Sequence, residues 1–306
     1  MASIDFVGVD WGTSSFRAWR CGADNQDQPL HKSDAGMSRL KPGEFAPYLD
    51  RVLRENDVAE TTLVVICGMA GARDGWTEVP YASAPASSKA VGQRAVSVKA
   101  GPYSCRILPG VSLVQDGRFD VMRGEETLLF GALSQGHGDG LYCLPGTHSK
   151  WCQIENGRLT HWRTVMTGEL FALLSSQSTL SGFCSSGASD VHNRPEFASA
   201  VHDVLIGARS VMQDLFTIRA RALLDPDADE YNFSAQLSGL LVGEEIAGLG
   251  LDGTPDVILI SGGPIRDVYR AALSIAGMNV RTVEAEDAAL AGLKRFAQEL
   301  AHHMNT

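Results

Sequence analysis

A glycine turn between two short strands occurs twice in this chain, and no other feature constrains its fold as strongly. The first turn is Gly12-Thr13-Ser14-Ser15 and the second is Gly146-Thr147-His148-Ser149. An apolar run enters each turn and a further strand-like run leaves it, which is the pattern of strand, tight turn and strand. The flanking strands are expected at 4–9, 16–20, 141–144 and 151–155.

Two matched hairpins in a chain of 306 residues predict a duplicated α/β domain. We place the first domain at 1–136 and the second at 137–306, with the glycine-rich segment 136–140 as the hinge. The turn Asn156-Gly157 is a strong hairpin signal, so the second hairpin should continue into a third strand at 158–162.

The spacing of apolar residues predicts the remaining elements. Continuous apolar runs indicate buried parallel strands, and apolar positions that recur at helical spacing indicate amphipathic helices. In the helix that begins after Pro42-Gly43-Glu44, the inward positions are expected to be Phe45, Leu49, Val52 and Leu53. Further strands are expected at 63–67, 256–260 and 280–283, and further helices at 201–216 and 289–300.

The acidic composition excludes several kinds of partner. The chain has 26 Lys+Arg against 36 Asp+Glu, a net charge of −10, whereas nucleic acids and anionic membranes require a basic surface. No run approaches the ~18 apolar residues of a membrane span, and the first residues carry no basic leader. We expect a soluble, cytoplasmic protein with no nucleic-acid or membrane partner, and an apolar face on the 201–216 helix that could support a homodimer. The six cysteines lack zinc-ligand spacing and are expected to be buried, reduced thiols.

A third glycine turn, Ser261-Gly262-Gly263-Pro264, follows the strand expected at 256–260. Glycine lets backbone N–H groups approach an anion closely, and Ser and Thr hydroxyls add further donors. Three such turns suggest two phosphate-binding hairpins and a strand–helix junction that holds a nucleotide. The motif GxxxxGK[ST] is absent, which excludes a Walker A site, and the absence of GxGxxG counts against a Rossmann dinucleotide site.

These turns resemble the phosphate 1, phosphate 2 and adenosine motifs of the actin/hexokinase/sugar-kinase superfamily. The matching segments are 9–15, 144–151 and 260–264. More closely, the chain resembles the 2-dehydro-3-deoxygalactonokinase family along nearly its whole length. That resemblance also includes the segments 67–71, 75–81, 122–127 and 166–171.

The resemblance implies two duplicated ribonuclease-H-like domains of the actin/hexokinase type with an interdomain cleft. The N-terminal domain would bind the sugar acid and phosphate, and the C-terminal domain would bind the nucleotide. The implied activity, with ATP and Mg²⁺, is phosphorylation of 2-dehydro-3-deoxy-D-galactonate to its 6-phosphate in galactonate catabolism. Two alternatives stay open: a kinase for another sugar or sugar acid on the same scaffold, and a nucleotide switch that binds protein partners.

Phosphoryl transfer to a sugar hydroxyl needs a base near that hydroxyl. Related sugar kinases place an acid after a glycine shortly before the second hairpin, and Glu125 follows Gly124 at that location. Glu125 is the first candidate for the base and Glu126 the second, while Asp10 is the competing assignment. The alternative is that both glutamates are ordinary first-turn acids, which the helix dipole favours.

Asp10 is also the leading group for a metal ion. The superfamily often carries an acid two positions before the glycine of the second hairpin, but Leu144 occupies that position here. Asp10 holds the corresponding position in the first hairpin. Because Mg²⁺ dehydrates reluctantly, Asp10 is expected to act on it through water.

The carboxylate of a sugar acid needs a cation, and the planar guanidinium group suits it. Arg17, Arg73 and Arg123 lie in or beside the matched motifs, and we favour Arg123 and Arg73. Each arginine could instead form a structural salt bridge. Three aromatic residues are candidates to stack on the acceptor or, equally, to pack in the core. These are Trp11, Trp76 and Tyr81.

The three glycine turns supply the expected contacts to ATP. Two roles stay open for His148: it donates a hydrogen bond to phosphate, or it is a neutral residue that supports the turn. Thr167 is expected to cap the helix that follows. The expected ATP-binding residues are Gly12, Thr13, Ser14, Gly146, Thr147, His148, Ser149, Lys150, Ser261, Gly262, Gly263 and Pro264.

Overall fold

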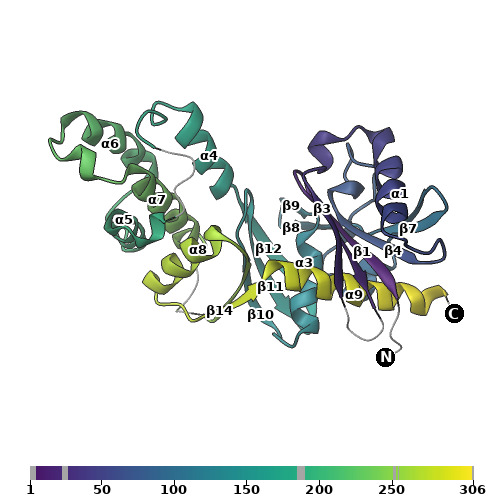
Figure 1. The fold of residues 1–306 in the computed structure, drawn as a ribbon. Helices are drawn as coiled ribbons and strands as arrows, with labels where there is room; N and C mark the ends of the chain where they lie inside the picture. The colour runs from purple at the N-terminus through teal and green to yellow at the C-terminus, as the bar shows by residue number, and fades with distance from the viewer. Residues whose placement is uncertain (1–4, 23–26, 185–189, 251–252, 254, 305–306) are drawn as a thin grey trace. The chain divides into compact units, whose positions relative to one another are not determined.

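The computed structural model describes residues 5–22, 27–184, 190–250, 253 and 255–304, and the statements below concern these residues (Figure 1). The first residue of the strand expected at 4–9 lies outside the described residues. In the described chain, strands form three sheets and pack with nine α-helices.

The first sheet has six strands in the order β3-β2-β1-β4-β7-β6. β1 pairs antiparallel with β2, as the first predicted hairpin requires, and parallel with β4. β4 in turn pairs parallel with β7. The strands are β1 Phe6–Trp11, β2 Phe16–Cys21, β3 Gln28–Ser33, β4 Leu63–Gly68, β6 Val96–Ala100 and β7 Tyr103–Ile107.

The second sheet repeats this order as β12-β11-β10-β13-β14. Its central pairs β10–β13 and β13–β14 are parallel, like the β1–β4 and β4–β7 pairs of the first sheet. The same strand order around two glycine hairpins confirms the predicted duplication. The strands are β10 Gly140–Leu144, β11 Ser149–Glu155, β12 Arg158–Val165, β13 Val257–Ser261 and β14 Val280–Glu284.

A small third sheet has the order β5-β8-β9. Its strands are β5 Ala82–Ser83, β8 Val111–Gln115 and β9 Arg118–Met122. The helices are α1 Phe45–Glu55, α2 Ser88–Gly92, α3 Glu125–Ser134, α4 Thr167–Gln177, α5 Pro195–Leu205, α6 Val211–Leu224, α7 Phe233–Ala247, α8 Pro264–Ile275 and α9 Ala285–Met304. Short 3-10 turns are η1 Met37–Arg39, η2 Pro42–Glu44, η3 Met69–Gly71, η4 Val191–Asn193 and η5 Ala228–Glu230.

The first core forms between the first sheet and α1. Phe45, Leu49, Val52 and Leu53 are fully buried there, so the inward face expected for this helix is confirmed. In the second part of the chain, α5, α7 and α8 pack with β10 and β13 around a separate core. The six cysteines are all free and buried, as expected.

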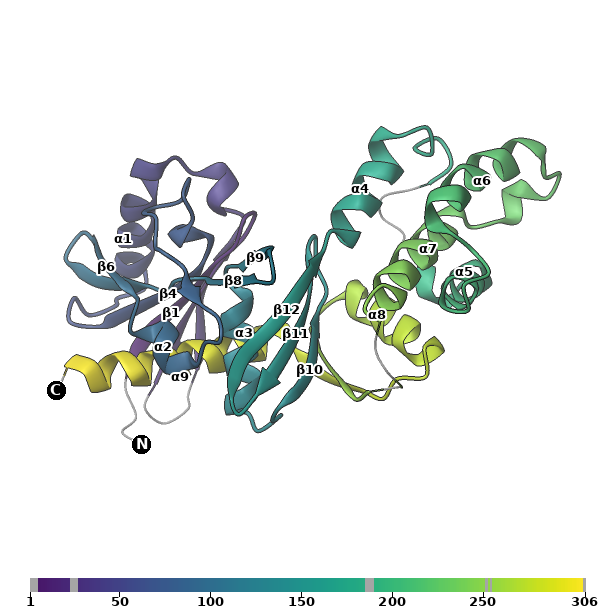
Figure 2. The same cartoon turned by 180° about the vertical axis from the view of Figure 1, so that it is seen from behind.

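The chain divides into two compact units. The first is Met1–Asp139 with Gln153–Trp162 and Ala285–Thr306, and the second is Gly140–Cys152 with Arg163–Glu284. The main break lies within the glycine-rich segment expected as the hinge. The grouping departs from the predicted boundaries at two segments. Ala285–Thr306 joins the first unit, where α9 packs along α3, as both views show (Figure 1, Figure 2). Gln153–Trp162 joins it as well, and Leu159 there pairs with Ala86.

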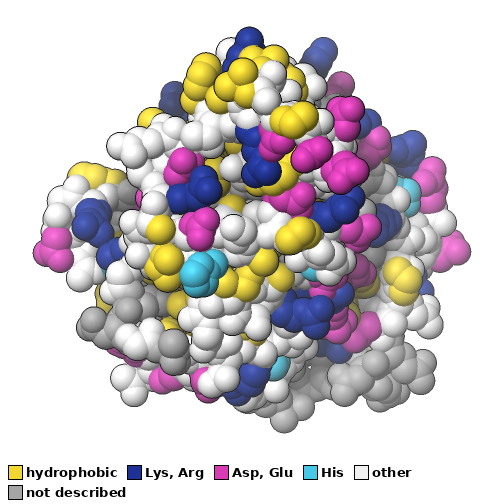
Figure 3. Space-filling view, turned by 90° about the vertical axis from the view of Figure 1, so that its left-hand side faces the viewer, with side chains coloured by type: hydrophobic (Ala, Val, Ile, Leu, Met, Phe, Trp, Pro, Cys, Tyr) yellow, Lys and Arg dark blue, Asp and Glu magenta, His cyan; other side chains and the backbone are white. Residues whose placement is uncertain are grey.

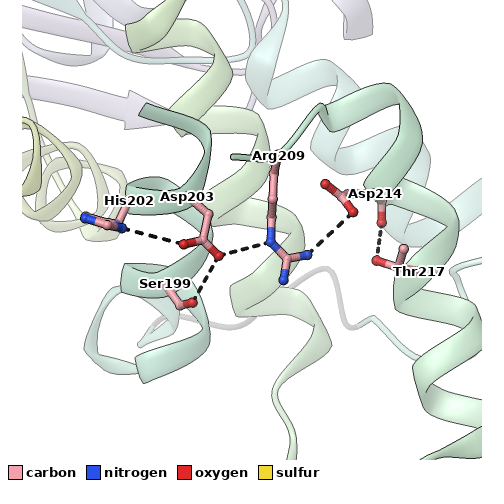
Figure 4. Close-up of polar contacts among 6 residues, drawn as sticks. All are labelled: Ser199, His202, Asp203, Arg209, Asp214 and Thr217. Carbon is pink, nitrogen blue, oxygen red and sulfur yellow. Dashed lines mark hydrogen bonds and ion pairs between the residues drawn. The ribbon is translucent and has the colours of Figure 1, made fainter. Parts of the chain in front are cut away.

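The helix predicted at 201–216 is wrong as one element, because the structure has α5 and α6 there. The chain turns at Gly207, whose φ is +71°. Arg209 connects the two helices through ion pairs with Asp203 on α5 at 3.0 Å and with Asp214 on α6 at 3.5 Å (Figure 4). Ser199 also donates a hydrogen bond to Asp203 at 3.4 Å.

The break also changes which apolar residues are buried. Val201 and Val204 on α5 are buried, whereas Met212 and Phe216 on α6 are 84% and 64% exposed. Figure 3 shows the side of the molecule that lies on the left in Figure 1, and apolar side chains are exposed there among basic and acidic ones. No helix in the described part of the chain is long and apolar enough to cross a membrane.

The α3–α9 contact depends on two glycines. A methyl group on Gly131 would overlap the carbonyl oxygen of Ala288, and one on Gly292 would overlap that of Thr127. The helices therefore approach each other through backbone, with no room for side chains at the crossing.

We predict that Gly131→Ala lowers the free energy of unfolding by about 2 kcal/mol or more, measured by urea denaturation. Overpacking against backbone costs about 1–3 kcal/mol or more, which outweighs the gain in helix propensity of about 1 kcal/mol. Gly43→Ala is the matched control, because nothing lies within 4 Å of its added methyl group. Equal stability of Gly131→Ala and the wild type would contradict this packing.

Candidate functional site

In the first unit, the carboxyl ends of β1 and β4 meet the start of α3. Asp10 pairs in register with Cys67, whose sulfur lies 3.9 Å from Asp10 Oδ1. A methyl group on Gly68 would lie 3.5 Å from the same oxygen, and one on Gly124 would lie 3.4 Å from Gly68 Cα. The structure thus brings both Asp10 and the loop before α3 close to Gly68.

Asp10 forms an ion pair with Arg17 at 2.7 Å, and its side chain is only 13% exposed. Burial raises the pKa of Asp10 above its usual value, and the Arg17 guanidinium opposes this shift. Arg17 also lies 3.9 Å from Glu286. Arg17 is a candidate to bind the acceptor carboxylate, but it is already paired with Asp10, the candidate metal-binding residue. This pairing favours a structural salt bridge as the role of Arg17.

Glu125 and Glu126 both fold back onto the loop before α3. Glu125 accepts a hydrogen bond from the backbone N–H of Arg123 at 3.0 Å, and Glu126 accepts one from that of Gly124 at 2.7 Å. Both contacts are those of first-turn acids that satisfy free backbone donors. Gly124 takes a φ of +106° here, a conformation that favours glycine.

Glu126 differs from Glu125 in its burial. Its side chain has no exposed surface, and Thr127 donates a hydrogen bond to its second oxygen at 3.1 Å. Burial, followed by the neighbouring Glu125, raises the pKa of Glu126 to about 8. Burial and the carboxyl groups of Asp10 and Glu126 also raise the pKa of the Cys67 thiol. Because Glu126 has no exposed surface, a substrate hydroxyl has no access to its carboxyl group in this structure.

Arg123 stacks on an aromatic ring beside this loop. Its Cζ lies 4.4 Å from the ring centroid of Tyr81, and Nη2 donates to the carbonyl of Val79 at 2.8 Å. Among the described residues, its Nε and Nη1 are buried and have no hydrogen-bond partner. Arg73 is exposed on the loop after η3. Two of the three predicted carboxylate-binding arginines thus remain available, one on each of two neighbouring loops.

Trp11 is a core residue. It has no exposed surface, and its indole N–H donates to the carbonyl of Ala35 at 2.9 Å. Its ring packs edge-on against Phe16 at 4.8 Å, with Trp76 at 6.3 Å. Because the indole is fully buried, the structure favours the second of the two expected roles for Trp11, a core aromatic residue. Tyr81 retains 36% exposure and stays a candidate, as does the half-buried Trp76.

The first two residues of η1 support the first glycine turn. The N–H groups of Met37 and Ser38 donate to the carbonyls of Gly12 and Thr13 at 3.0 and 2.9 Å. The Gly12 N–H donates a hydrogen bond to the Ser15 carbonyl across the turn at 2.8 Å. Thr13 and Ser14 are exposed. The carbonyls face the protein, so Thr13 and Ser14 are the exposed donors of this turn.

The second glycine turn packs on the start of α4. The Glu169 N–H donates to the Thr147 carbonyl at 3.0 Å, and a methyl group on Gly168 would overlap the Gly146 carbonyl. His148 Nε2 lies 2.5 Å from a carboxylate oxygen of Glu169. This contact joins the turn to α4, while His148 stays exposed, so His148 supports the turn and can still meet a ligand.

Two of the predicted phosphate donors of this turn are buried. Ser149 shares a hydrogen bond of 2.7 Å with Tyr269, and Lys150 Nζ donates to the His148 carbonyl at 3.0 Å. Thr147 and His148 are the exposed members. The expectation that Thr167 caps α4 is wrong, because Met166 holds the cap position and Thr167 bonds Glu245 instead.

A pocket of about 370 Å³ in the second unit opens beside the second turn. Gly146 and Thr147 form one edge, and Pro264 at the start of α8 lies on the wall. Thr167 and Tyr269 add polar groups. Its apolar lining is Phe171, Val191, Leu241, Val242, Ile265 and Val268. A slot with apolar walls and a few polar groups has the composition of a small-molecule site.

The third glycine turn leads directly into this pocket through Pro264. Gly263, with a φ of +65°, precedes the first residue of α8. A methyl group on Gly262 would lie 3.5 Å from a carboxylate oxygen of Glu284. The Ser261 hydroxyl is buried and has no hydrogen-bond partner among the described residues. Of these four predicted residues, Pro264 alone lines the pocket.

Glu245 on α7 is a site residue that the sequence did not single out. It is 3% exposed and accepts hydrogen bonds from Trp151 Nε1 and Tyr269 OH at 2.7 Å each, and from Thr167. Burial raises the pKa of Glu245, and these donors oppose the shift. The available signal was its spacing, since Glu245 follows the buried Leu237 and Leu241 at intervals of four residues.

We predict a pH-dependent gain in stability for Glu126→Gln. The pKa of Glu126 is about 8 in the folded chain against an ordinary 4.5, so the wild type loses stability as pH rises between these values. Gln cannot ionise, so the difference in free energy of unfolding should grow by up to about 1.4 kcal/mol per pH unit.

Urea denaturation at pH 5, 6, 7 and 8 measures this difference. Glu55→Gln, on the exposed face of α1, is the control and should leave the pH slope unchanged. A constant difference between Glu126→Gln and the wild type over this range would contradict the assignment.

Comparison with known proteins identifies the family. The model of the 2-keto-3-deoxy-galactonokinase family matches residues 10–296. The chain is 38% identical over 298 residues to the Rhizobium meliloti (strain 1021) protein named "Probable 2-dehydro-3-deoxygalactonokinase DgoK1", which covers 96% of this chain and 97% of the relative. It is 32% identical over 299 residues to the 2-dehydro-3-deoxygalactonokinase of Escherichia coli (strain K12), covering 97% and 99%.

A solved structure agrees with this match. A crystal structure described as that of a 2-dehydro-3-deoxygalactonokinase protein from Sinorhizobium meliloti superposes with a TM-score of 0.86, at 38% identity over 96% of each chain. The fold is therefore the duplicated α/β fold of the actin/hexokinase type. By these matches the chain belongs to the 2-keto-3-deoxy-galactonokinase family of sugar kinases.

Proposed function

We propose that this protein transfers the γ-phosphoryl group of ATP to the terminal hydroxyl of 2-dehydro-3-deoxy-D-galactonate, giving the 6-phosphate and ADP. The observation that carries the proposal is the family match over residues 10–296, which includes Asp10, the acids that begin α3 and all three glycine turns. The family implies a phosphotransferase that uses ATP. The substrate is the one named for relatives that share 38% and 32% of their residues with this chain.

The second unit is proposed to hold the nucleotide. Its pocket offers apolar walls for an adenine base and ends at the Gly146–Thr147 edge, where phosphates would meet exposed donors. Thr147 and His148 are proposed to contact phosphate oxygens directly, with Ser149 and Lys150 supporting the turn from beneath. Thr13 and Ser14, exposed on the first turn, are proposed as the corresponding donors of the first unit.

Asp10 is proposed to hold Mg²⁺ through water. In the described chain, no group of three or more His, Cys, Asp or Glu side chains could bind a metal ion by itself. A single carboxylate fits Mg²⁺ bound mainly by ATP phosphates and water, which is how this ion usually sits in kinases. The ion would neutralise charge on the transferred phosphoryl group. Arg17 orients Asp10 through their 2.7 Å ion pair.

Glu125 is proposed as the base that accepts the proton of the terminal hydroxyl. Glu126 has no exposed surface, so it is assigned to fixing the Gly124 loop. Glu125 is half-buried at the same helix start and reaches the surface. Asp10 is the remaining alternative. Arg123 on the Tyr81 ring and the exposed Arg73 are proposed to bind the carboxylate of the acceptor.

We predict acceptor-dependent release of ADP when the protein is given ATP-Mg and 2-dehydro-3-deoxy-D-galactonate. A coupled assay should show faster turnover with this compound than with its gluconate epimer, and very little without an acceptor. Turnover only with another sugar or sugar acid would reassign the substrate. Slow hydrolysis that responds to no acceptor would remove the kinase assignment and favour a nucleotide switch.

Substitutions of Glu125 and Asp10 distinguish the general base from the residue that binds Mg²⁺. We predict that Glu125→Gln lowers kcat by about 10²- to 10⁴-fold, the usual contribution of a general base, with little change in the Mg²⁺ concentration needed for half activity. Asp10→Asn should instead raise that Mg²⁺ requirement as well as lower kcat. Full activity of Glu125→Gln, with loss of the acidic limb of the pH profile in Asp10→Asn, would make Asp10 the base.

A further inference from the structure

Glu245 gathers hydrogen bonds from three other elements of the second unit. Trp151 lies on β11 just after the second glycine turn, Thr167 is the first residue of α4, and Tyr269 lies on α8. All three donate to its carboxylate. Tyr269 also bonds Ser149 at 2.7 Å, which adds a second connection to β11. One buried carboxylate on α7 thus joins the turn, α4 and α8.

These connections reach the nucleotide pocket. Thr167 and Tyr269 line it directly, and Thr167 is followed by Gly168, where an added methyl group would overlap the Gly146 carbonyl. The pocket edge formed by Gly146 and Thr147 therefore depends on the position of the first turn of α4. Glu245 itself does not line the pocket, so any effect on a ligand passes through its partners.

Burying a carboxylate at position 245 is unfavourable in free energy compared with burying an apolar side chain there. Removing its charge from water is unfavourable unless good hydrogen bonds compensate, and α7 is otherwise buried along most of its length. An apolar residue here would pack at less cost, but it would leave the Trp151 N–H without an acceptor. Charge-assisted hydrogen bonds restrict geometry more than apolar contacts do.

We propose that Glu245 is a positioning residue for the nucleotide: it fixes the second glycine turn and the start of α4 relative to α8, so that the pocket is formed before ATP binds. This inference rests on the proposed function in that it takes the pocket as the ATP site. Preorganisation of this kind lowers the free energy that binding must spend on ordering the site. It should affect affinity for the nucleotide and leave acceptor binding in the first unit alone.

Glu245→Gln tests this on the full-length protein. Gln keeps an oxygen for Trp151 but presents an amide N–H₂ where Thr167 and Tyr269 now donate. The Kd for ADP by calorimetry and the KM for ATP should both rise about 10- to 100-fold, the usual effect of losing a hydrogen bond to a charged group. kcat at saturating ATP and KM for the acceptor should change less than about threefold, a factor that corresponds to well under 1 kcal/mol.

Two further comparisons separate positioning from simple stabilisation. Thr167→Val removes the hydroxyl but keeps the shape, so it should weaken ADP binding, and Thr167→Ser should recover most of that loss. Glu299→Gln is the matched control, because this carboxyl on α9 is only 13% exposed and accepts from Ser88 and Arg295 at 2.7 Å in the first unit. It should lower the melting temperature without changing the Kd for ADP.

The outcomes distinguish this inference from the proposed function. Unchanged ADP affinity in a folded Glu245→Gln protein, verified by circular dichroism, would overturn the inference while wild-type kinase activity stands. The same would follow if Glu299→Gln weakened ADP binding equally. ADP binding that depends on Glu245, in a wild type that phosphorylates no sugar acid, would support the inference and overturn the proposed function.

Discussion

The parallel pairing of β1 with β4 determines the position of Asp10 in the first unit. Parallel strands end at the same edge of a sheet, so Asp10 and Cys67 lie side by side and Gly68 follows at the point where α3 arrives. The start of α3 is in turn fixed by α9, which crosses it at Gly131 and Gly292 with backbone contact. Register and helix crossing together place Asp10, Glu125 and Glu126 around Gly68.

Each unit contains one deeply buried carboxyl group that holds a loop needed for the proposed chemistry. Glu126 binds the N–H of Gly124 in the first unit, and Glu245 binds Trp151, Thr167 and Tyr269 in the second. Burial raises the pKa of both. Their environments differ, because Glu126 contacts backbone and a threonine next to it, whereas Glu245 joins segments far apart in the sequence. The first orders a local turn and the second orders a pocket.

The glycine turns also differ between the units. The first is supported by the N–H groups of Met37 and Ser38 at the start of η1, which donate to its carbonyls. The second is supported by the start of α4 and by the contact between His148 and Glu169. In both cases a neighbouring segment donates to backbone carbonyls of the turn, and polar side chains stay exposed: Thr13 and Ser14 in the first turn, Thr147 and His148 in the second. A phosphate-binding loop has this requirement, because a loop that is free to move would lose affinity to ordering.

The sequence by itself predicted the strands of the two glycine hairpins, β4, β13 and β14, as well as α1 and the family, because alternation, turn residues and short motifs are local properties. It did not predict β3 or the strands from β5 to β9. It also supplied Asp10, Glu125, Arg123 and Pro264 as candidate site residues. Only the tertiary structure decided which of the candidates are engaged: Trp11 is sealed in a core, Arg17 is paired with Asp10, and Ser149 turns inward to Tyr269. The three partners of Glu245 and the break between α5 and α6 likewise became visible only in three dimensions. Burial, ion pairing and helix crossing depend on residues distant in the chain, and no local pattern encodes those partners.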